Sequence, residues 1–205
     1  MLRIADLIDQ QQERLALAES QDQGKPVNLA RNMDIPRAAY NFRKFAYAWQ
    51  NLLETSNAMP EADVVNISSR HPLGVAGLIS PWNLPLYLLT FKLAPAIMSG
   101  NTVVAKPSEM TSVTAWMLCD ILREAELPEG VVNMVFGFGA SVGQSIVTHP
   151  KVRMISFTGS TLVGQKIAQL TATSMKKVSL ELGGKNAAVI FNDADVDAAV
   201  AGVAR

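Results

Sequence analysis

Residues 102–136 read TVVAKPSEMTSVTAWMLCDILREAELPEGVVNMVF. The apolar run Thr102–Lys106 predicts a short buried strand, and the spacing of apolar residues in Thr111–Ala125 predicts an amphipathic helix. A turn at Pro128 then separates this helix from a second apolar run, Val131–Phe136, which predicts another strand. A strand, a helix and a strand of these lengths form a βαβ unit, so the two strands are expected to run parallel in one sheet.

The same alternation continues on both sides of this unit. Further strands are predicted at Val75–Ile79, Val152–Thr158, Val178–Leu182 and Ala187–Phe191. Further helices are predicted at Leu86–Met98, Ser141–Thr148 and Thr161–Thr171, and from Asp195 to Arg205. Strands of this length between helices indicate an α/β fold, a Rossmann-like parallel sheet of about five strands with helices on both faces.

Two helices are expected before the sheet. Ile4–Ala18 carries one apolar stripe, and Gly24 and Pro26 break that helix. A second helix is predicted from about Asp34, with Pro36 in its first turn. Its buried face is expected to consist of Phe42, Phe45, Ala46, Trp49, Leu52 and Leu53. Val64–Ser68 is expected to form a strand that pairs with Val75–Ser80, so residues 1–61 form a helical segment and residues 62–74 a hairpin.

Composition excludes several classes of protein. The chain has 205 residues, of which 49% are hydrophobic and 18% charged, with a formal net charge of zero. This composition excludes a disordered chain and argues against nucleic-acid and anionic-membrane binding. One cysteine and two histidines argue against disulfides and a metal site. No signal peptide and no apolar run long enough to span a membrane are recognisable, so we expect a cytoplasmic protein.

Two glycine-containing turns follow predicted strands. Gly137–Gly143 is one residue too long for the dinucleotide-binding fingerprint, and it is either a cofactor contact or a tight turn that needs small residues. Phe157–Thr161 opens a helix that Ser160 or Thr161 can cap. The free amides at such a helix start suit a pyrophosphate, although simple capping is the alternative.

Three further motifs lie where parallel strands end, the edge at which open α/β sheets bind ligands. In Lys106-Pro107-Ser108-Glu109 the ammonium and carboxylate could share a ribose diol, or form a solvated ion pair. Asn83 follows Pro81-Trp82 and offers an amide donor for an oxyanion, or occupies a turn. Glu181 stands before Gly183 and Gly184 and is either a general base or an exposed acid.

These motifs, in this order and spacing, resemble the NAD(P)-dependent aldehyde dehydrogenase superfamily. The resemblance covers nearly the whole chain, and Gly77–Leu122 is most similar to the branch that oxidises muconic semialdehydes. It implies that residues 75–205 form a dinucleotide-binding domain and that the catalytic domain of the family is lacking. It also implies that residues 62–74 are related to the oligomerisation element, so a homo-oligomer is expected.

The resemblance implies roles for individual residues. The cofactor-binding set would be Trp82, Lys106, Ser108, Glu109, Gly139, Gly143, Phe157, Thr158, Gly159, Ser160, Leu182 and Gly183. Trp82 and the Ser160 junction would flank the pyrophosphate, and Lys106 and Glu109 would hold the adenosine ribose. The carboxylate of Glu109 would repel a 2′-phosphate, which favours NAD over NADP. Asn83 would stabilise the oxyanion of a thiohemiacetal, and Glu181 would activate the water that hydrolyses the thioester.

The nucleophile of the family is expected to be missing. In family members a cysteine follows the Glu-Leu-Gly-Gly-Lys motif by a few dozen residues, whereas only 20 residues follow Lys185 here, and none is cysteine. Cys119 lies in an amphipathic helix, where a buried thiol is usually inert. We therefore expect the NAD-binding part of a longer aldehyde-oxidising enzyme, with both ends cut and no activity alone. A non-catalytic nucleotide-binding or scaffold module, or a complete small reductase, are the alternatives.

Overall fold

The computed structural model describes residues 1–203, so the predicted extension of the last helix to Arg205 lies outside the described residues. The elements are α1 (Leu2–Gln10), α2 (Gln12–Gln23), α3 (Val27–Leu29), α4 (Ile35–Gln50), β1 (Ser56–Met59), β2 (Val64–Ile67), β3 (Val75–Ile79), α5 (Pro85–Met98), β4 (Thr102–Lys106), α6 (Val113–Glu124), β5 (Val132–Met134), α7 (Gln144–Thr148), β6 (Val152–Gly159), α8 (Thr161–Ala172), β7 (Lys177–Leu182) and α9 (Val196–Val203). None of the helices described in residues 1–203 is long and apolar enough to cross a membrane.

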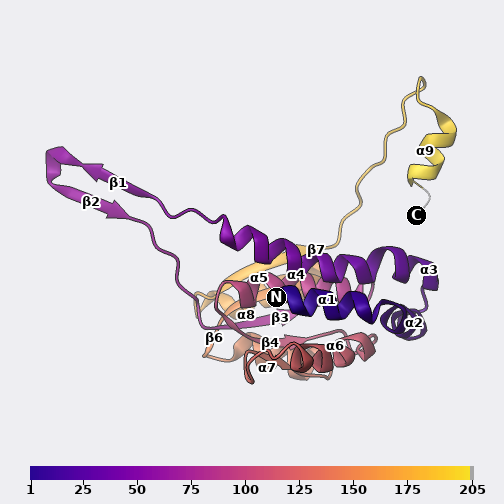
Figure 1. The fold of residues 1–205 in the computed structure, drawn as a ribbon, viewed down its shortest axis with the longest axis horizontal. Coiled ribbons are helices and arrows are strands. Elements are labelled where there is room, and N and C mark those ends of the chain that lie inside the picture. Colours follow the sequence, from indigo (N-terminus) through magenta and orange to yellow (C-terminus); the bar gives the residue numbers. More distant parts are fainter. Residues whose placement is uncertain (204–205) are drawn as a thin grey trace.

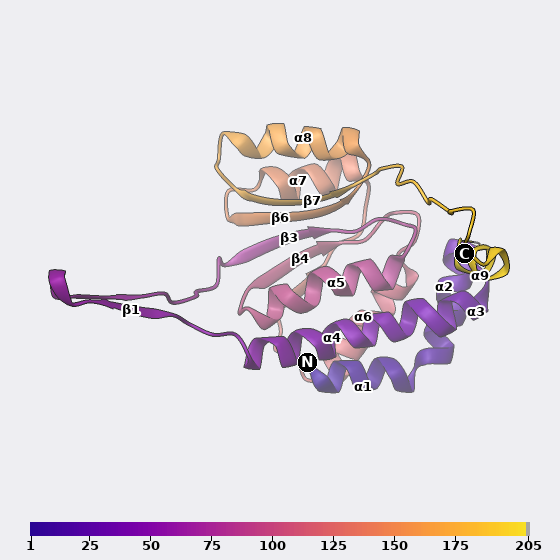
Figure 2. The same ribbon diagram turned by 90° about the horizontal axis from the view of Figure 1, so that it is seen from above.

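The predicted parallel sheet is confirmed. Five strands lie in the order β5-β4-β3-β6-β7, and every neighbouring pair is parallel. Helices cover both faces: α7 and α8 lie on one side, and α5, α6, α4 and α1 on the other (Figure 2). The alternation of β3 explains this, because Ala76 and Leu78 join the core under α4, α5 and α6, whereas Ile79 joins the core under α7 and α8.

The order of the strands places a topological switch point at the carboxyl edge of the sheet, between β3 and β6. β3 and β6 are neighbours, but the helix that follows β3 lies on the face opposite to the helix that follows β6 (Figure 2). This is the point where strand order reverses, and ligands of open α/β sheets bind there. The topology therefore selects the ends of β3, β4, β6 and β7 as the place to look for a site.

The N-terminal helical layer differs in detail from the prediction. The first helix is broken at Gln11, where φ is −102° and ψ is 15°, and α2 ends at Gly24 with a φ of 86°. Helical structure resumes at Val27, earlier than predicted, and passes through a π turn at Ala30–Asp34 into α4. α4 ends at Gln50, so the expected burial of its last turn is wrong. Trp49 is 39% exposed, Leu52 42% and Leu53 79%.

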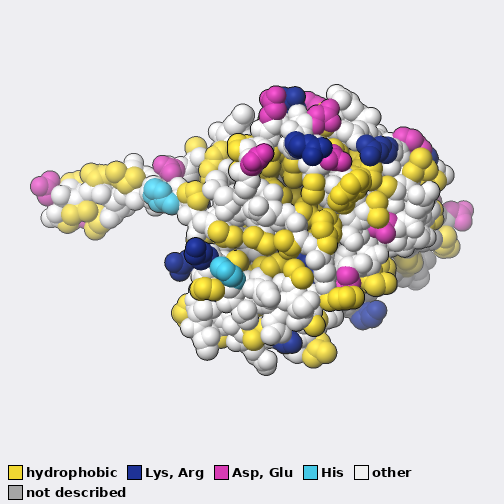
Figure 3. All heavy atoms as spheres, turned by 90° about the horizontal axis from the view of Figure 1, so that it is seen from below, with side chains coloured by type: hydrophobic (Ala, Val, Ile, Leu, Met, Phe, Trp, Pro, Cys, Tyr) yellow, Lys and Arg dark blue, Asp and Glu magenta, His cyan; other side chains and the backbone are white. Residues whose placement is uncertain are grey.

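The predicted pairing of Val64–Ser68 with Val75–Ser80 is also wrong. β2 pairs with β1 in an antiparallel hairpin of residues 56–67, and β3 belongs to the large sheet. The strands of this hairpin therefore lie on both sides of residue 61, instead of within 62–74. The hairpin projects from the body of the molecule (Figure 1), and hydrophobic side chains are exposed along it (Figure 3). Val65 and Ile67 are 63% and 72% exposed.

The segment after β7 leads away from the sheet (Figure 1). The strand predicted at Ala187–Phe191 is wrong, because the segment adopts no regular structure and all of its residues are exposed. The predicted start of the last helix is confirmed, since the backbone amide of Ala198 donates to Oδ1 of Asp195 at 3.0 Å. An apolar run does not specify a strand unless a neighbouring strand is present to pair with it.

Candidate functional site

Four strand ends bring most of the predicted site residues to one edge. Ile79 of β3 is paired with Lys106 of β4 on one side and with Phe157 of β6 on the other. Thr158 of β6 is paired with Glu181 of β7, and the next pair is Gly159 with Leu182. Residues that are far apart in sequence therefore meet within a few strand widths, as the parallel topology requires.

Lys106 and Glu109 form an ion pair at the end of β4. The Lys106 side chain is 2% exposed, and its Nζ donates to Oε2 of Glu109 and to the backbone oxygen of Pro107, each at 2.9 Å. Glu109 accepts hydrogen bonds from its own backbone amide, from Lys106 and from the Gly139 amide, and these lower the pKa of its carboxyl group. The carboxylate is therefore charged at neutral pH, and it is partly exposed, so it can accept a hydrogen bond from a ligand.

Glu109 lines a pocket of about 490 Å³ on the α7 and α8 side of the sheet. Three other predicted cofactor-binding residues, Gly139, Gly143 and Phe157, line the same pocket. The remaining lining is largely apolar and comes from the end of β3, from the turn after β5, from α7 and from α8. A mostly apolar cavity with one convergent carboxylate is the usual form of a small-ligand site.

The glycine-containing turn forms one wall of this pocket. Gly137 has a φ of 145°, and residues Gly139–Gly143 form a π turn that leads into α7. A Cβ atom on Gly143 would lie 3.8 Å from Cδ of Lys106, whereas a Cβ atom on Gly139 would have no neighbour within 4 Å. The turn therefore runs close to Lys106 at Gly143 and leaves open space at Gly139.

The junction between β6 and α8 lies beside the end of β7. Ser160 caps α8, because its Oγ accepts a hydrogen bond from the Val163 amide at 3.4 Å. Leu182 packs so closely on α8 that a Cβ atom on Gly164 would lie 2.5 Å from its Cδ2 atom. Thr158, Gly159, Ser160, Leu182 and Gly183 thus adjoin one another but are not part of the pocket lining.

Trp82 and Asn83 lie in the loop between β3 and α5, also outside the pocket. Trp82 is 57% exposed, and Asn83 is exposed as well. Ser108 is half-buried and stabilises its own loop, since its Oγ accepts a hydrogen bond from the Met110 amide at 3.2 Å. The predicted residues therefore fall into a compact group around Glu109 and a more exposed group along the strand ends.

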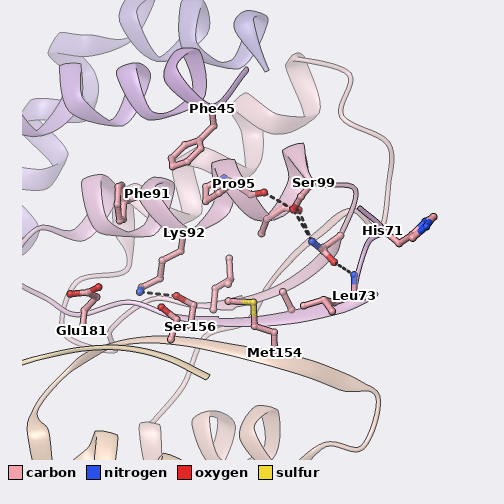
Figure 4. A pocket seen from close by; sticks show the side chains of 15 residues that line it. Phe45, His71, Leu73, Phe91, Lys92, Pro95, Ser99, Met154, Ser156 and Glu181 are labelled. Atoms are coloured by element: carbon pink, nitrogen blue, oxygen red, sulfur yellow. Dashed lines mark hydrogen bonds between the residues drawn. The ribbon is translucent and has the colours of Figure 1, made fainter. Parts of the chain in front are cut away.

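Glu181 faces the opposite side of the sheet from the Glu109 pocket. It lines a second cavity, of about 410 Å³, together with Lys92 of α5 and Ser156 of β6 (Figure 4). Nζ of Lys92 donates to Oγ of Ser156 at 3.1 Å. Burial lowers the pKa of Lys92 to about 8, although the charge of Glu181 acts to raise it. Asn83 lies in the loop that leads into α5, and Glu181 lines the cavity beside α5. Both predicted catalytic residues are therefore near α5.

Cys119 has the environment of a structural thiol. It lies in α6 and is half-buried, which corrects the expectation of full burial. Its Sγ atom lies 3.5 Å from the backbone oxygen of Ala115. Burial and the neighbouring Asp120 raise its pKa, so the thiol stays protonated at neutral pH. Among residues 1–203, no three or more His, Cys, Asp or Glu side chains are grouped to hold a metal ion.

Sequence reasoning missed several residues that line the Glu109 pocket. These are Ile79, Phe138, Ala140, Gln144, Val147, Val163, Lys166, Ile167 and Leu170. The four α8 members follow the Ser160 cap at positions i, i+3, i+4 and i+7 counted from Val163, so they share one face of the helix. That spacing was available as a signal. However, apolar residues at helical spacing ordinarily indicate a helix face that is packed in the protein core. Here that face of α8 lines a cavity instead, because the glycine turn lies on the other side of the pocket.

Comparison with known proteins identifies the family. The model of the aldehyde dehydrogenase family matches residues 1–205, so the chain belongs to the aldehyde dehydrogenase family. It is 56% identical over 203 residues to 2-aminomuconic semialdehyde dehydrogenase of Danio rerio, covering 99% of this chain and 42% of that protein. It is 45% identical to 2-hydroxymuconic semialdehyde dehydrogenase of Pseudomonas sp. (strain CF600), covering 99% of this chain and 43% of that protein. The predicted resemblance to the muconic semialdehyde branch is confirmed.

Solved structures agree with this assignment. An aldehyde dehydrogenase from Bacillus cereus in an NAD+ complex superimposes with a TM-score of 0.95 at 38% identity, covering 98% of this chain and 41% of that one. An NAD-dependent aldehyde dehydrogenase from Sinorhizobium meliloti has a TM-score of 0.95 at 43% identity, covering all of this chain and 40% of that one. The chain thus spans about two-fifths of the length of the relatives that it matches.

Proposed function

We propose that this chain forms the NAD-binding part of an enzyme that oxidises an aldehyde to a carboxylic acid. The single observation that carries the proposal is the pocket that unites Glu109, Gly139, Gly143 and Phe157 beside the buried Lys106. The names of the relatives suggest a muconic semialdehyde or a similar semialdehyde as the substrate. The alternative is a nucleotide-binding module that catalyses no reaction, and an activity assay must distinguish it from part of an enzyme.

The residues present fit the adenosine half of a dinucleotide. The apolar pocket of about 490 Å³ can hold an adenine ring, and Glu109 offers a charged acceptor for ribose hydroxyls. The open space at Gly139 lets a ligand approach the backbone. We therefore assign the adenine to the α7 and α8 side, with Glu109 at the ribose. A carboxylate disfavours a 2′-phosphate, which supports NAD over NADP.

The rest of the dinucleotide would extend along the strand ends, across the switch point between β3 and β6. Trp82 and the amides at the start of α8 would bind the pyrophosphate, because a helix N-terminus carries partial positive charge. Ser108, Thr158, Gly159, Leu182 and Gly183 would line this path. When bound, the cofactor supplies the acceptor for the hydride of the aldehyde. This path would end on the α5 side, where Glu181 lies.

Asn83 and Glu181 would act on the substrate. The Asn83 amide would donate a hydrogen bond to the aldehyde oxygen as negative charge develops on it. Glu181 would take a proton from the water that releases the acid. Cys119 is not suited to attack an aldehyde, because burial raises its pKa and it lies within α6. We therefore assign the nucleophile to a cysteine outside these 205 residues.

The test is a calorimetric titration of the chain with NAD, with an activity assay on a panel of aldehydes. We expect binding without turnover. Turnover that Cys119→Ser abolishes would overturn the assignment of the nucleophile. No binding of NAD or NADP at millimolar concentration would contradict the proposed pocket. In a chain extended by the remainder of a relative, recovered turnover would favour the enzyme over the non-catalytic module.

We also propose that the protein forms a homo-oligomer in the cytoplasm. The projecting β1–β2 hairpin supports association, because Val65 and Ile67 are largely exposed on a two-stranded element that packs little against its own chain (Figure 1). The free thiol of Cys119 is compatible with a reducing compartment. Sedimentation of the chain with and without residues 56–67 would test the role of the hairpin.

A further inference from the structure

A buried charge cluster lies beneath the loop that carries Trp82 and Asn83. Glu19 of α2 and Asp34, which ends the π turn before α4, are both 0% exposed, and Lys25 is 9% exposed. Nζ of Lys25 bonds to Oδ2 of Asp34 and lies 4.0 Å from Oε1 of Glu19. The cluster therefore holds two acids and one base inside the protein, on elements that precede the loop by more than 45 residues in the sequence.

Two members of this cluster bond directly to the loop and to the helix that follows it. Nζ of Lys25 donates to the backbone oxygen of Asn83 at 3.1 Å. Oε2 of Glu19 accepts from the Leu86 amide at 3.4 Å, in the first turn of α5, and from Oγ1 of Thr114 at 2.8 Å. The loop is thus held at its end by Lys25 and at the helix start by Glu19.

Stability alone does not account for such a cluster. Burial of three ionisable groups carries a large desolvation cost, and well-packed apolar residues are often at least as stabilising. Oε1 of Glu19 and Oδ1 of Asp34 are buried without a hydrogen-bond partner, which adds to this cost. What these ionisable groups provide, and apolar groups could not, is directional hydrogen bonds to the Asn83 oxygen and the Leu86 amide.

We infer that the Glu19–Lys25–Asp34 cluster positions the Trp82–Asn83 loop for cofactor and substrate. This inference rests on the proposed function, which gives that loop its role. Lys25 and Glu19 touch neither ligand in this scheme, so they are positioning residues. Asp34 holds the ammonium of Lys25 in place, and Lys25 in turn fixes the direction of the Asn83 backbone.

The variants are Lys25→Met and the double variant Lys25→Met with Asp34→Asn. The double variant removes the bond to Asn83 without leaving Asp34 as an unpaired buried charge. Arg31→Met is the matched control, because Arg31 also pairs with an acid, Glu13, in the same helical layer, at 2.6 Å, but does not contact the loop. Each variant is compared with the unaltered chain by thermal unfolding and by hydrogen exchange.

We expect the backbone amides of residues 82–84 and 86–88 (Pro85 has none) to exchange at least tenfold faster in the folded double variant, with the amides of β4 unchanged. Arg31→Met should change the exchange rate neither of the loop amides nor of the β4 amides. Unchanged exchange in the loop, or equal acceleration in β4, would overturn the inference, since the cluster would then have no role or only a general structural one. Failure of both Lys25 variants to fold would overturn it in the same way.

A titration with NAD provides the functional readout. We expect the double variant to bind NAD at least fivefold more weakly, and the control variant to bind as the unaltered chain does. If the unaltered chain binds no NAD, the proposed function fails, but the exchange experiment still decides whether the cluster orders the loop. If NAD binding is unchanged in the double variant although loop exchange has increased, the cluster orders the loop without serving the cofactor, and the inference is wrong.

Discussion

Nζ of Lys106 and Oε2 of Glu109 lie 2.9 Å apart, and the two residues differ sharply in exposure. The Lys106 side chain is 2% exposed and that of Glu109 is 36% exposed, so the lysine is buried behind a carboxylate that solvent and ligands can contact. The buried ammonium orients the carboxylate, and its hydrogen bond adds to that of the Glu109 backbone amide in lowering the pKa of the carboxyl group. In the proposed function, this carboxylate is the acceptor for the ribose.

Replacement of Glu109 by Gln should weaken NAD binding by about tenfold, which corresponds to about 1.4 kcal/mol. The amide is a weaker acceptor, and it no longer repels a 2′-phosphate, so the margin between NAD and NADP should narrow. Calorimetric titration of both cofactors measures this. Glu129→Gln is the control, because Glu129 precedes β5 and lies at the opposite edge of the sheet. Unchanged selectivity in Glu109→Gln would contradict the assigned role.

Replacement of Gly159 by Ala should destabilise the fold by roughly 1–3 kcal/mol and weaken NAD binding. A Cβ atom at Gly159 would overlap the ring of Phe157, which is 6% exposed and lines the Glu109 pocket. The ring would have to move within a packed core. Urea unfolding gives the stability change, and Gly184→Ala should be near neutral because a Cβ atom there has no neighbour within 4 Å. Equal effects of the two variants would show that the Phe157 contact is unimportant.

Lys166 is the one positively charged side chain among the residues that line the Glu109 pocket in the described part of the chain. Replacement by Ala should lower the affinity for NADP about threefold to fivefold and change that for NAD less than twofold, since an exposed lysine pairs weakly with an added phosphate. Lys151→Ala, in the exposed turn before β6, controls for the loss of net charge. Equal losses for NAD and NADP would assign Lys166 to a contact that both cofactors share.

The stability of the chain should depend on pH through Glu19. Burial raises the pKa of Glu19 to about 7, and the charge of Asp34 adds to this, although the Thr114 hydrogen bond and Lys25 oppose it. Between about pH 4.5 and 7 the folded state therefore keeps a proton that the unfolded state has released. The contribution of Glu19 to the free energy of unfolding should fall by about 2–4 kcal/mol as pH rises through this range, and then level off.

Glu19→Gln should remove this component. Urea unfolding at several pH values measures the difference in unfolding free energy between the two proteins, so the titration of other acids cancels. We expect the stability of Glu19→Gln relative to the unaltered chain to increase from pH 4.5 to pH 7. A difference that is constant with pH would mean that Glu19 titrates with an ordinary pKa.

Much of the fold could be predicted because it depends on local patterns. The strands Thr102–Lys106 and Val75–Ile79 were predicted with their observed bounds. Helical spacing alone did not reveal where α4 ends. Leu52 and Leu53 continue the apolar spacing beyond Gln50, but both side chains are exposed and the helix has already ended. The roles of the individual site residues stay predictions.

The sequence by itself determined the alternation of strands and helices, the family, and which polar residues stand at strand ends, because these depend on neighbours in the chain. Only the tertiary structure decided which of them meet. It separated Glu181 from the Glu109 pocket by the thickness of the sheet, since side chains alternate between faces, and paired β2 with β1 instead of β3. It also joined Lys25 to Asn83 across 58 residues. Pairing and burial depend on contacts between distant segments, which no local pattern encodes.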